Sequence, residues 1–169
     1  LTDEEVIARC PWATTGRTHH RTPNIITSLE LDPAEMEKRN IHLQKKYAEI
    51  EENEVRFEEL HCEDSEYLIV AFGSCARIAQ KAMEMAREEG IKVGLLRPIT
   101  LWPFPSKAIA ARAAQVKGIL TVELNAGQMV EDVRLAVECK VPVEHFGRLG
   151  GIVPDPDEVI TALKEKLIK

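Results

Sequence analysis

The side chains best suited to recognition in this sequence lie just after apolar runs. Arg97 and Arg148 carry guanidinium groups, whose paired donors match the oxygens of a carboxylate, either on a substrate or on a neighbouring protein. Glu123 and Asn125 end another apolar run and could hold a polar substrate. We favour the alternative that Asn125 forms a turn while Glu123 pairs with a basic residue.

Two aromatic residues are candidates for protein contact. Trp102 and Phe104 alternate with prolines in the stretch Arg97–Pro105, which makes a stiff loop. Large aromatic side chains held rigidly are typical anchors of protein interfaces. The alternative, that both cover the local core, has equal weight.

The usual patterns of catalysis are missing from the sequence. The strand-to-helix turn Gly73-Ser74 could offer N–H groups to a phosphate, but no glycine-rich nucleotide motif is present, so we predict a turn capped by Ser74 without a nucleotide. We predict that His145 is a sheet-surface or interface histidine and not a general base. The sequence contains no C-x-x-C pair, the spacing that zinc and iron–sulfur sites use. We therefore expect reduced packing thiols at all four cysteines: Cys10, Cys62, Cys75 and Cys139. We therefore assign no catalytic, cofactor-binding or metal-binding residue.

Four apolar runs alternate with amphipathic stretches in the second part of the chain. The runs 67–72, 92–96, 119–124 and 141–146 predict strands, and the stretches 75–89, 105–116, 129–137 and 156–169 predict helices. This alternation favours a three-layer α/β/α domain over residues 61–169 with a mainly parallel sheet. The loops after the strands should share one edge, where open α/β sheets meet ligands or partners.

The first sixty residues have a different character. We expect residues 1–31 to be a linker or arm, because prolines, glycine and polar residues interrupt them. Residues 32–60 are predicted to be a helical connector, which begins with Asp32 as N-cap followed by Pro33 and Glu35. An apolar stripe through Leu43 and Tyr47 is expected to pack against another protein surface.

Composition excludes several functional classes. The 169-residue chain has a net charge of −6 and 44% hydrophobic residues, which favours a globular protein and argues against nucleic-acid binding. No apolar run has the length of a membrane span, and the start is not a signal peptide, so we expect a cytoplasmic location. The chain starts at Leu1 and not at Met, consistent with part of a longer polypeptide.

Three motifs of the α/β region together resemble the alpha subunits of 2-oxoacid:ferredoxin oxidoreductases. They are GLLRPITLWPFP from Gly94, ELNAGQMVEDVR from Glu123 and GRLGG from Gly147. The stretches PWATTG from Pro11 and NEVRFEE from Asn53 are most similar to the branched-chain (2-oxoisovalerate) type. The resemblance covers essentially the whole chain. It implies a domain like the C-terminal domain of transketolase.

This family oxidatively decarboxylates a 2-oxoacid to its acyl-CoA, with thiamine diphosphate, magnesium and iron–sulfur clusters in the complex and ferredoxin as electron acceptor. The resemblance implies that this segment holds none of these cofactors. Its expected role is assembly and shaping of the active-site surroundings in an oligomeric complex, against the N-terminal thiamine-binding domain and other subunits. The expected interface residues are Arg97, Trp102, Phe104, Asn125, Gln128 and Arg148.

Two alternatives remain open at this point. One is a free-standing flavodoxin-like module that binds a nucleotide or CoA at the Gly73-Ser74 turn and the Asn125 loop. The other is an interaction protein that inserts the stripe of the helix from Pro33 into a partner groove.

Overall fold

The computed structural model describes residues 2–10 and 29–168, which divide into two compact units at residues 43 and 44. In the first unit, helix α1 spans Asp3–Arg9, so the expected linker or arm of residues 1–31 begins with a short helix. Thr2 and Glu5 explain this helix as a capping box. The N–H of Glu5 donates to Thr2 Oγ1 at 3.3 Å, and the N–H of Thr2 donates to Glu5 Oε2 at 2.8 Å. Residues 11–28 of the arm lie outside the described residues.

Helix α2 spans Pro33–Asn53 and begins where its capping signals predict. Asp32 Oδ1 accepts hydrogen bonds from the backbone N–H groups of Ala34 and Glu35, at 2.8 and 3.2 Å. The prediction that this helix continues to about Leu60 is wrong. The chain leaves the helix after Asn53 and forms strand β1, Phe57–Leu60, instead.

Strand β1 exists because it pairs with a distant partner. The five-stranded sheet has the order β1-β3-β2-β4-β5, with β2 at Tyr67–Ala71, β3 at Val93–Pro98, β4 at Ile119–Glu123 and β5 at Val143–Gly147. Strand β1 runs antiparallel to β3, and the other neighbours are parallel. Glu58 lies opposite Arg97 in the register, and their side chains form a cross-strand ion pair at 2.8 Å.

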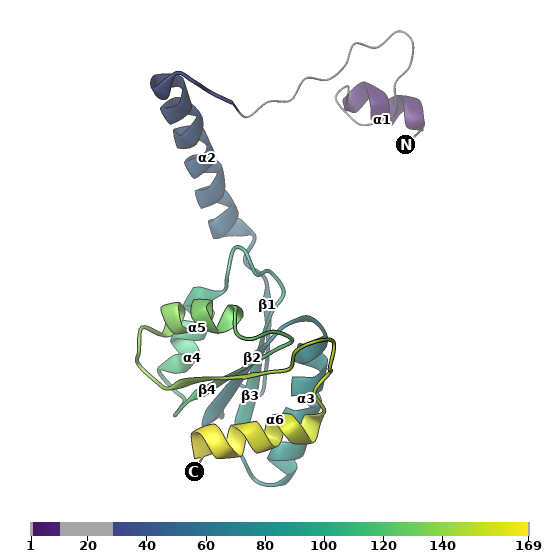
Figure 1. Ribbon diagram of the computed structural model, residues 1–169, viewed down its shortest axis with the longest axis vertical. Coiled ribbons are helices and arrows are strands. Elements are labelled where there is room, and N and C mark those ends of the chain that lie inside the picture. The colour runs from purple at the N-terminus through teal and green to yellow at the C-terminus, as the bar shows by residue number, and fades with distance from the viewer. Residues whose placement is uncertain (1, 11–28, 169) are drawn as a thin grey trace. The chain divides into compact units, whose positions relative to one another are not determined.

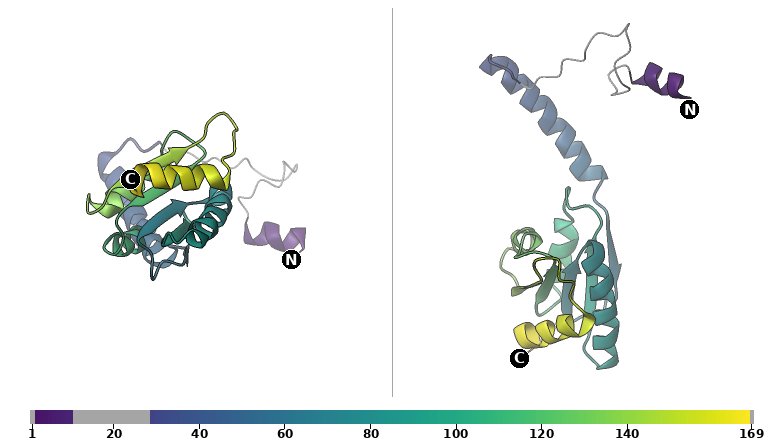
Figure 2. Two further views of the ribbon diagram at one scale, coloured as in Figure 1. Left: turned by 90° about the horizontal axis from the view of Figure 1, so that it is seen from below. Right: turned by 45° about the vertical axis from the view of Figure 1, so that its right-hand side comes forward.

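Helices cover both faces of the sheet, as the continuous apolar runs predict (Figures 1 and 2). Helix α3, Gly73–Glu88, and helix α6, Pro156–Leu163, bury their apolar faces with Ile69, Leu95 and Leu120. Helix α4, Ser106–Ala113, and helix α5, Met129–Val137, pack on the other face. The predicted three-layer α/β/α fold is thereby confirmed, with β1 as an additional antiparallel edge strand.

The helix ends agree with the predictions in part. Helix α3 begins at Gly73 without a side-chain cap, so the predicted capping role of Ser74 is wrong. Gly90 ends that helix as expected, with a φ of +86°. Asp155 and Glu158 form the expected capping box of α6, and a π-helical turn, Lys164–Ile168, follows that helix. Among the described helices, none is long and apolar enough to span a membrane.

Candidate functional site: the carboxyl edge of the sheet

The four parallel strands end at one edge of the sheet, which we call the carboxyl edge. The loops that leave it span residues 99–105 after β3, 124–128 after β4 and 148–155 after β5. The predicted interface residues therefore share this edge. They do not form one cluster, because β3 and β5 are separated by β2 and β4, a distance of roughly 14 Å at the usual strand spacing.

A buried carboxylate holds the loop after β4. Glu123, the last residue of that strand, is 1% exposed. Its Oε2 accepts hydrogen bonds from the N–H groups of Gln128 and Met129 at 3.2 and 2.8 Å, and its Oε1 accepts one from Val130 at 3.0 Å. These donors belong to the start of α5, where a helix favours negative charge. Glu123 thus acts as a cap supplied by a strand.

Glu123 has a basic neighbour, His145, but this residue is only a secondary partner of the carboxylate. His145 Nδ1 lies 3.4 Å from Glu123 Oε1 and 3.2 Å from Thr121 Oγ1. The main partners of the carboxylate are the three backbone N–H groups. Sequence reasoning missed this role, although an acidic residue at a strand end six residues before a helix was the available signal.

Asn125 forms a turn, as predicted. Its Oδ1 accepts a hydrogen bond from the N–H of Gly127 at 2.7 Å. The neighbouring β5 comes close at Gly147, where an added Cβ would lie 2.2 Å from the carbonyl oxygen of Asn125 and 2.6 Å from His145 Nε2. The side chain of Gln128 is exposed, while its backbone is held by Glu123. The 124–128 loop is therefore fixed from both sides.

The two arginines lie at opposite ends of the edge. Arg97 on β3 donates from Nη1 to Glu58, and Arg148 after β5 has Nη2 3.3 Å from Glu158 Oε1. In both arginines the Nε atom is buried and has no hydrogen-bond partner among the described residues. The two side chains are 43% and 38% exposed, so a partner that brings oxygen atoms could reach their exposed guanidinium N–H groups but not the buried Nε atoms.

The two aromatic residues of the 99–105 loop have different environments. Trp102 is 54% exposed and contacts Tyr47 edge-to-face, with ring centroids 5.6 Å apart. Phe104 is half-buried and packs on the core beneath α4 and α5. Each of the two alternatives considered for these residues thus applies to one of them. Phe104 covers the core, whereas Trp102 is exposed to solvent, as an anchor of a protein interface would be.

Exposed apolar side chains are concentrated at the carboxyl edge. Apart from Leu135 on α5, those described in the second unit belong to this edge or to the residues that pack beside it: Tyr47, Phe57, Ile99, Leu101, Trp102, Leu124, Leu149, Ile152 and Val153. An apolar surface that gathers on one side of a domain is typical of a protein interface. Within residues 2–10 and 29–168, no cluster of potential metal ligands is found.

A family model described as "Pyruvate:ferredoxin oxidoreductase core domain II" matches residues 65–159. The ketoisovalerate oxidoreductase subunit VorB of Methanothermobacter thermautotrophicus is 45% identical over 96% of this chain and 46% of the relative. The 2-oxoglutarate synthase subunit KorA of Archaeoglobus fulgidus is 32% identical over 83% of this chain and 40% of the relative. The chain thus spans less than half the length of these relatives.

Solved structures agree with these matches. A 2-oxoglutarate:ferredoxin oxidoreductase from Magnetococcus marinus, solved with 2-oxoglutarate, coenzyme A and succinyl-CoA bound, superposes with a TM-score of 0.70 at 25% identity. That match covers 80% of this chain and 24% of the solved one. A split-gene transketolase shares the fold, with a TM-score of 0.58 at 21% identity over 67% of this chain and 41% of the solved one.

Proposed function

Because the chain belongs to the family of pyruvate:ferredoxin oxidoreductase core domain II, we propose that it is the C-terminal portion of the alpha subunit of a 2-oxoacid:ferredoxin oxidoreductase. The complete complex would oxidatively decarboxylate a 2-oxoacid to its acyl-CoA in the cytoplasm. Thiamine diphosphate, magnesium, iron–sulfur clusters and CoA would be bound elsewhere in that complex, which would pass its electrons to ferredoxin.

The proposed substrate is 2-oxoisovalerate. Its support is the difference in similarity among the relatives: two ketoisovalerate oxidoreductase subunits are 45% and 44% identical, whereas 2-oxoglutarate synthase subunits are 30–34% identical. The first two matches also extend over more than 90% of this chain.

The role of this segment is to assemble the enzyme through the carboxyl edge and to shape the surroundings of its active site, without catalysis of its own. One observation carries this proposal: exposed large apolar side chains gather at that edge. The proposed contact residues are Arg97, Trp102, Phe104, Asn125, Gln128 and Arg148. The proposed partners are the thiamine-binding domain of the same subunit and the other subunits of the oligomer.

The test replaces apolar side chains at the edge in the complete complex. Leu101→Ser with Trp102→Ser removes two side chains that are 47% and 54% exposed, so the fold should persist, while association with the other subunits should weaken at least about tenfold. Leu135→Ser is the matched control, because Leu135 is 78% exposed on α5. Co-purification and 2-oxoisovalerate-dependent ferredoxin reduction are the readouts.

Two results would overturn the proposal. One is turnover of 2-oxoisovalerate by this chain without other subunits. The other is equal assembly of the Leu101/Trp102 variant and the Leu135 control.

A ligand screen separates this proposal from a free-standing nucleotide- or CoA-binding module. A ligand present at 100 times its Kd would stabilise the folded chain by about 2.7 kcal/mol. We expect no such stabilisation by nucleotides or CoA in thermal unfolding of the isolated chain. A clear rise in Tm with CoA would favour the binding module.

A further inference from the structure

A shallow hollow lies beside the end of β5 and follows α6 from its cap into the π-helical turn after it, away from the 99–105 loop. Its volume is about 490 Å³, and its apolar lining comes mainly from the half-buried Phe146, because Ala162 is only 5% exposed. The loop that joins its two walls carries Leu149, Ile152 and Val153, which are 58%, 54% and 60% exposed. The hollow and this loop together form an apolar surface that the described residues leave uncovered.

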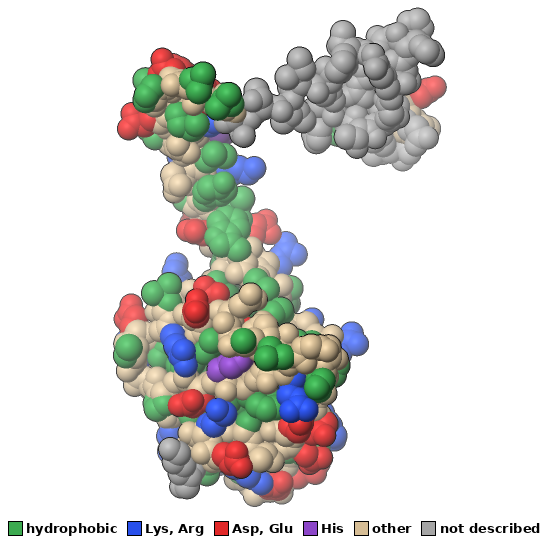
Figure 3. All heavy atoms as spheres, viewed as in Figure 1, with side chains coloured by type: hydrophobic (Ala, Val, Ile, Leu, Met, Phe, Trp, Pro, Cys, Tyr) green, Lys and Arg blue, Asp and Glu red, His purple; other side chains and the backbone are tan. Residues whose placement is uncertain are grey.

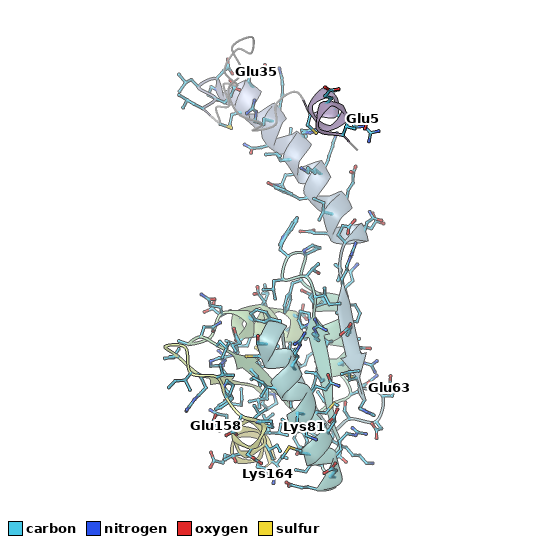
Figure 4. The ribbon with its side chains drawn as sticks, turned by 90° about the vertical axis from the view of Figure 1, so that its right-hand side faces the viewer. Glu5, Glu35, Glu63, Lys81, Glu158 and Lys164 are labelled. Atoms are coloured by element: carbon cyan, nitrogen blue, oxygen red, sulfur yellow. The ribbon has the colours of Figure 1, made fainter. Side chains whose placement is uncertain are left out.

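The walls of the hollow are held in place. Asp155 and Glu158 form the capping box of α6, with the N–H of Glu158 donating to Asp155 Oδ1 at 2.8 Å and the N–H of Asp155 donating to Glu158 Oε2 at 3.1 Å. Arg148 ties the loop to α6 through Glu158, which Figure 4 labels near the start of that helix. A site with fixed walls loses little conformational entropy when a partner binds.

The rim of the hollow is acidic. Its lining includes the carboxylates of Asp155, Asp157, Glu158 and Glu165, against the single cation of Lys166. Asp157 and Glu165 are exposed and form no ion pair with the described residues. Figure 3 shows acidic side chains gathered on the side of the unit where α6 begins. An apolar floor inside an acidic rim complements an apolar anchor flanked by cations.

We propose that this hollow docks a segment of another polypeptide of the oxidoreductase, in which a large apolar side chain is flanked by lysine or arginine residues. This inference rests on the proposed function for the identity of the complex. The apolar side chain would fill the hollow against Phe146 and Ala162, and the cations would pair with Asp157 and Glu165. Charge complementarity decides the occupant, since an acidic segment would meet like charges at the same rim.

Carbodiimide cross-linking of the complete complex tests the contact directly. The reagent activates a carboxyl group, which then forms an amide with a nearby lysine, while the carbodiimide is released as a urea. We expect Asp157 or Glu165 to be joined to a lysine that lies beside a large apolar residue in a partner polypeptide. Peptide mass spectrometry after digestion identifies both ends of each cross-link.

Charge variants test how strongly the acidic rim contributes to association. They also detect a partner that uses arginine in place of lysine, with which the carbodiimide cross-link does not form. Asp157→Lys with Glu165→Lys should weaken association of this chain with the complex at least about tenfold at 0.15 M salt and much less at 1 M salt. Glu63→Lys with Glu88→Lys is the matched control, because it makes the same change of charge at exposed positions before β2 and at the end of α3, which lie at the opposite end of the sheet from the carboxyl edge. The control should change association by less than about twofold.

The outcomes separate this inference from the proposed function. If the complex assembles and turns over substrate while the hollow variants bind as well as the control pair, the hollow is not a docking site, although the proposed function stands. Equal weakening by both pairs would likewise overturn the inference, since it would show an effect of net charge alone. Failure of the unmodified chain to join any oxidoreductase complex would overturn both.

Discussion

Replacing Glu123 tests whether one strand carboxylate holds the start of α5. Hydrogen bonds to an ionised acceptor contribute about 1.5–3 kcal/mol each, and Glu123 accepts three of them from backbone N–H groups. Glu123→Gln keeps one acceptor oxygen but turns an amide NH₂ group toward at least one of the donors. We expect a loss of about 2–3 kcal/mol in the free energy of unfolding.

Glu123→Ala should cost more, about 4–5 kcal/mol, because all three donors lose their acceptor in a buried place. Urea unfolding followed by far-UV circular dichroism measures both variants. With a slope of about 2 kcal/mol per M, the Gln variant should shift the midpoint down by about 1–1.5 M. Glu131→Gln is the control, since it removes one exposed charge near the same helix start and should cost no more than about 1 kcal/mol.

Amide hydrogen exchange localises the effect. If Glu123 anchors the helix start, the amides of Gln128, Met129 and Val130 should exchange about 30 to 150 times faster in the Gln variant. The reasoning is refuted if the Gln variant matches the Glu131 control in stability, or if those amides keep their protection.

Further predictions concern the pH dependence of stability, the thiols and the packing beside the site. Arg112 donates to both oxygens of Glu59 at 2.7 and 2.8 Å, which lowers the pKa of that carboxyl group. A lowered native pKa gives stability that is present above the ordinary Glu value of about 4.3 and is lost as the pH falls through the native pKa. Glu59→Gln should therefore destabilise the protein at pH 7 by about 1–3 kcal/mol and flatten the acid limb of a plot of stability against pH. Burial raises the pKa of Cys62 to about 11, while Cys139 is exposed. With a thiol reagent at pH 8, Cys139→Ser should remove a fast phase and Cys62→Ser should leave that phase intact. Gly147→Ala would place a Cβ 2.2 Å from a backbone oxygen of the loop after β4, and thermal unfolding should show a loss of about 2 kcal/mol or more.

The amino-acid sequence was sufficient for the elements of the α/β unit and for their layers. The unbroken apolar run at 67–72 predicts a strand covered on both faces, and β2 is such a strand. The Asp155 and Glu158 signature predicts the start of α6, because a capping box acts between residues three apart. Sharing of one edge by the loops follows from the parallel strands alone.

Tertiary structure decided what depends on residues far apart in the chain. Phe57–Leu60 has the composition to extend α2, and it becomes a strand because the free edge of β3 offers hydrogen-bond partners about forty residues away. Glu123 accepts from the start of α5 only because β4 ends beside that helix. The separation of Arg97 from Arg148 is set by strand order. Caps and periodicity act between near neighbours and are therefore visible in a single sequence, whereas strand order and the partners of a buried carboxylate arise from long-range contacts that local patterns do not encode.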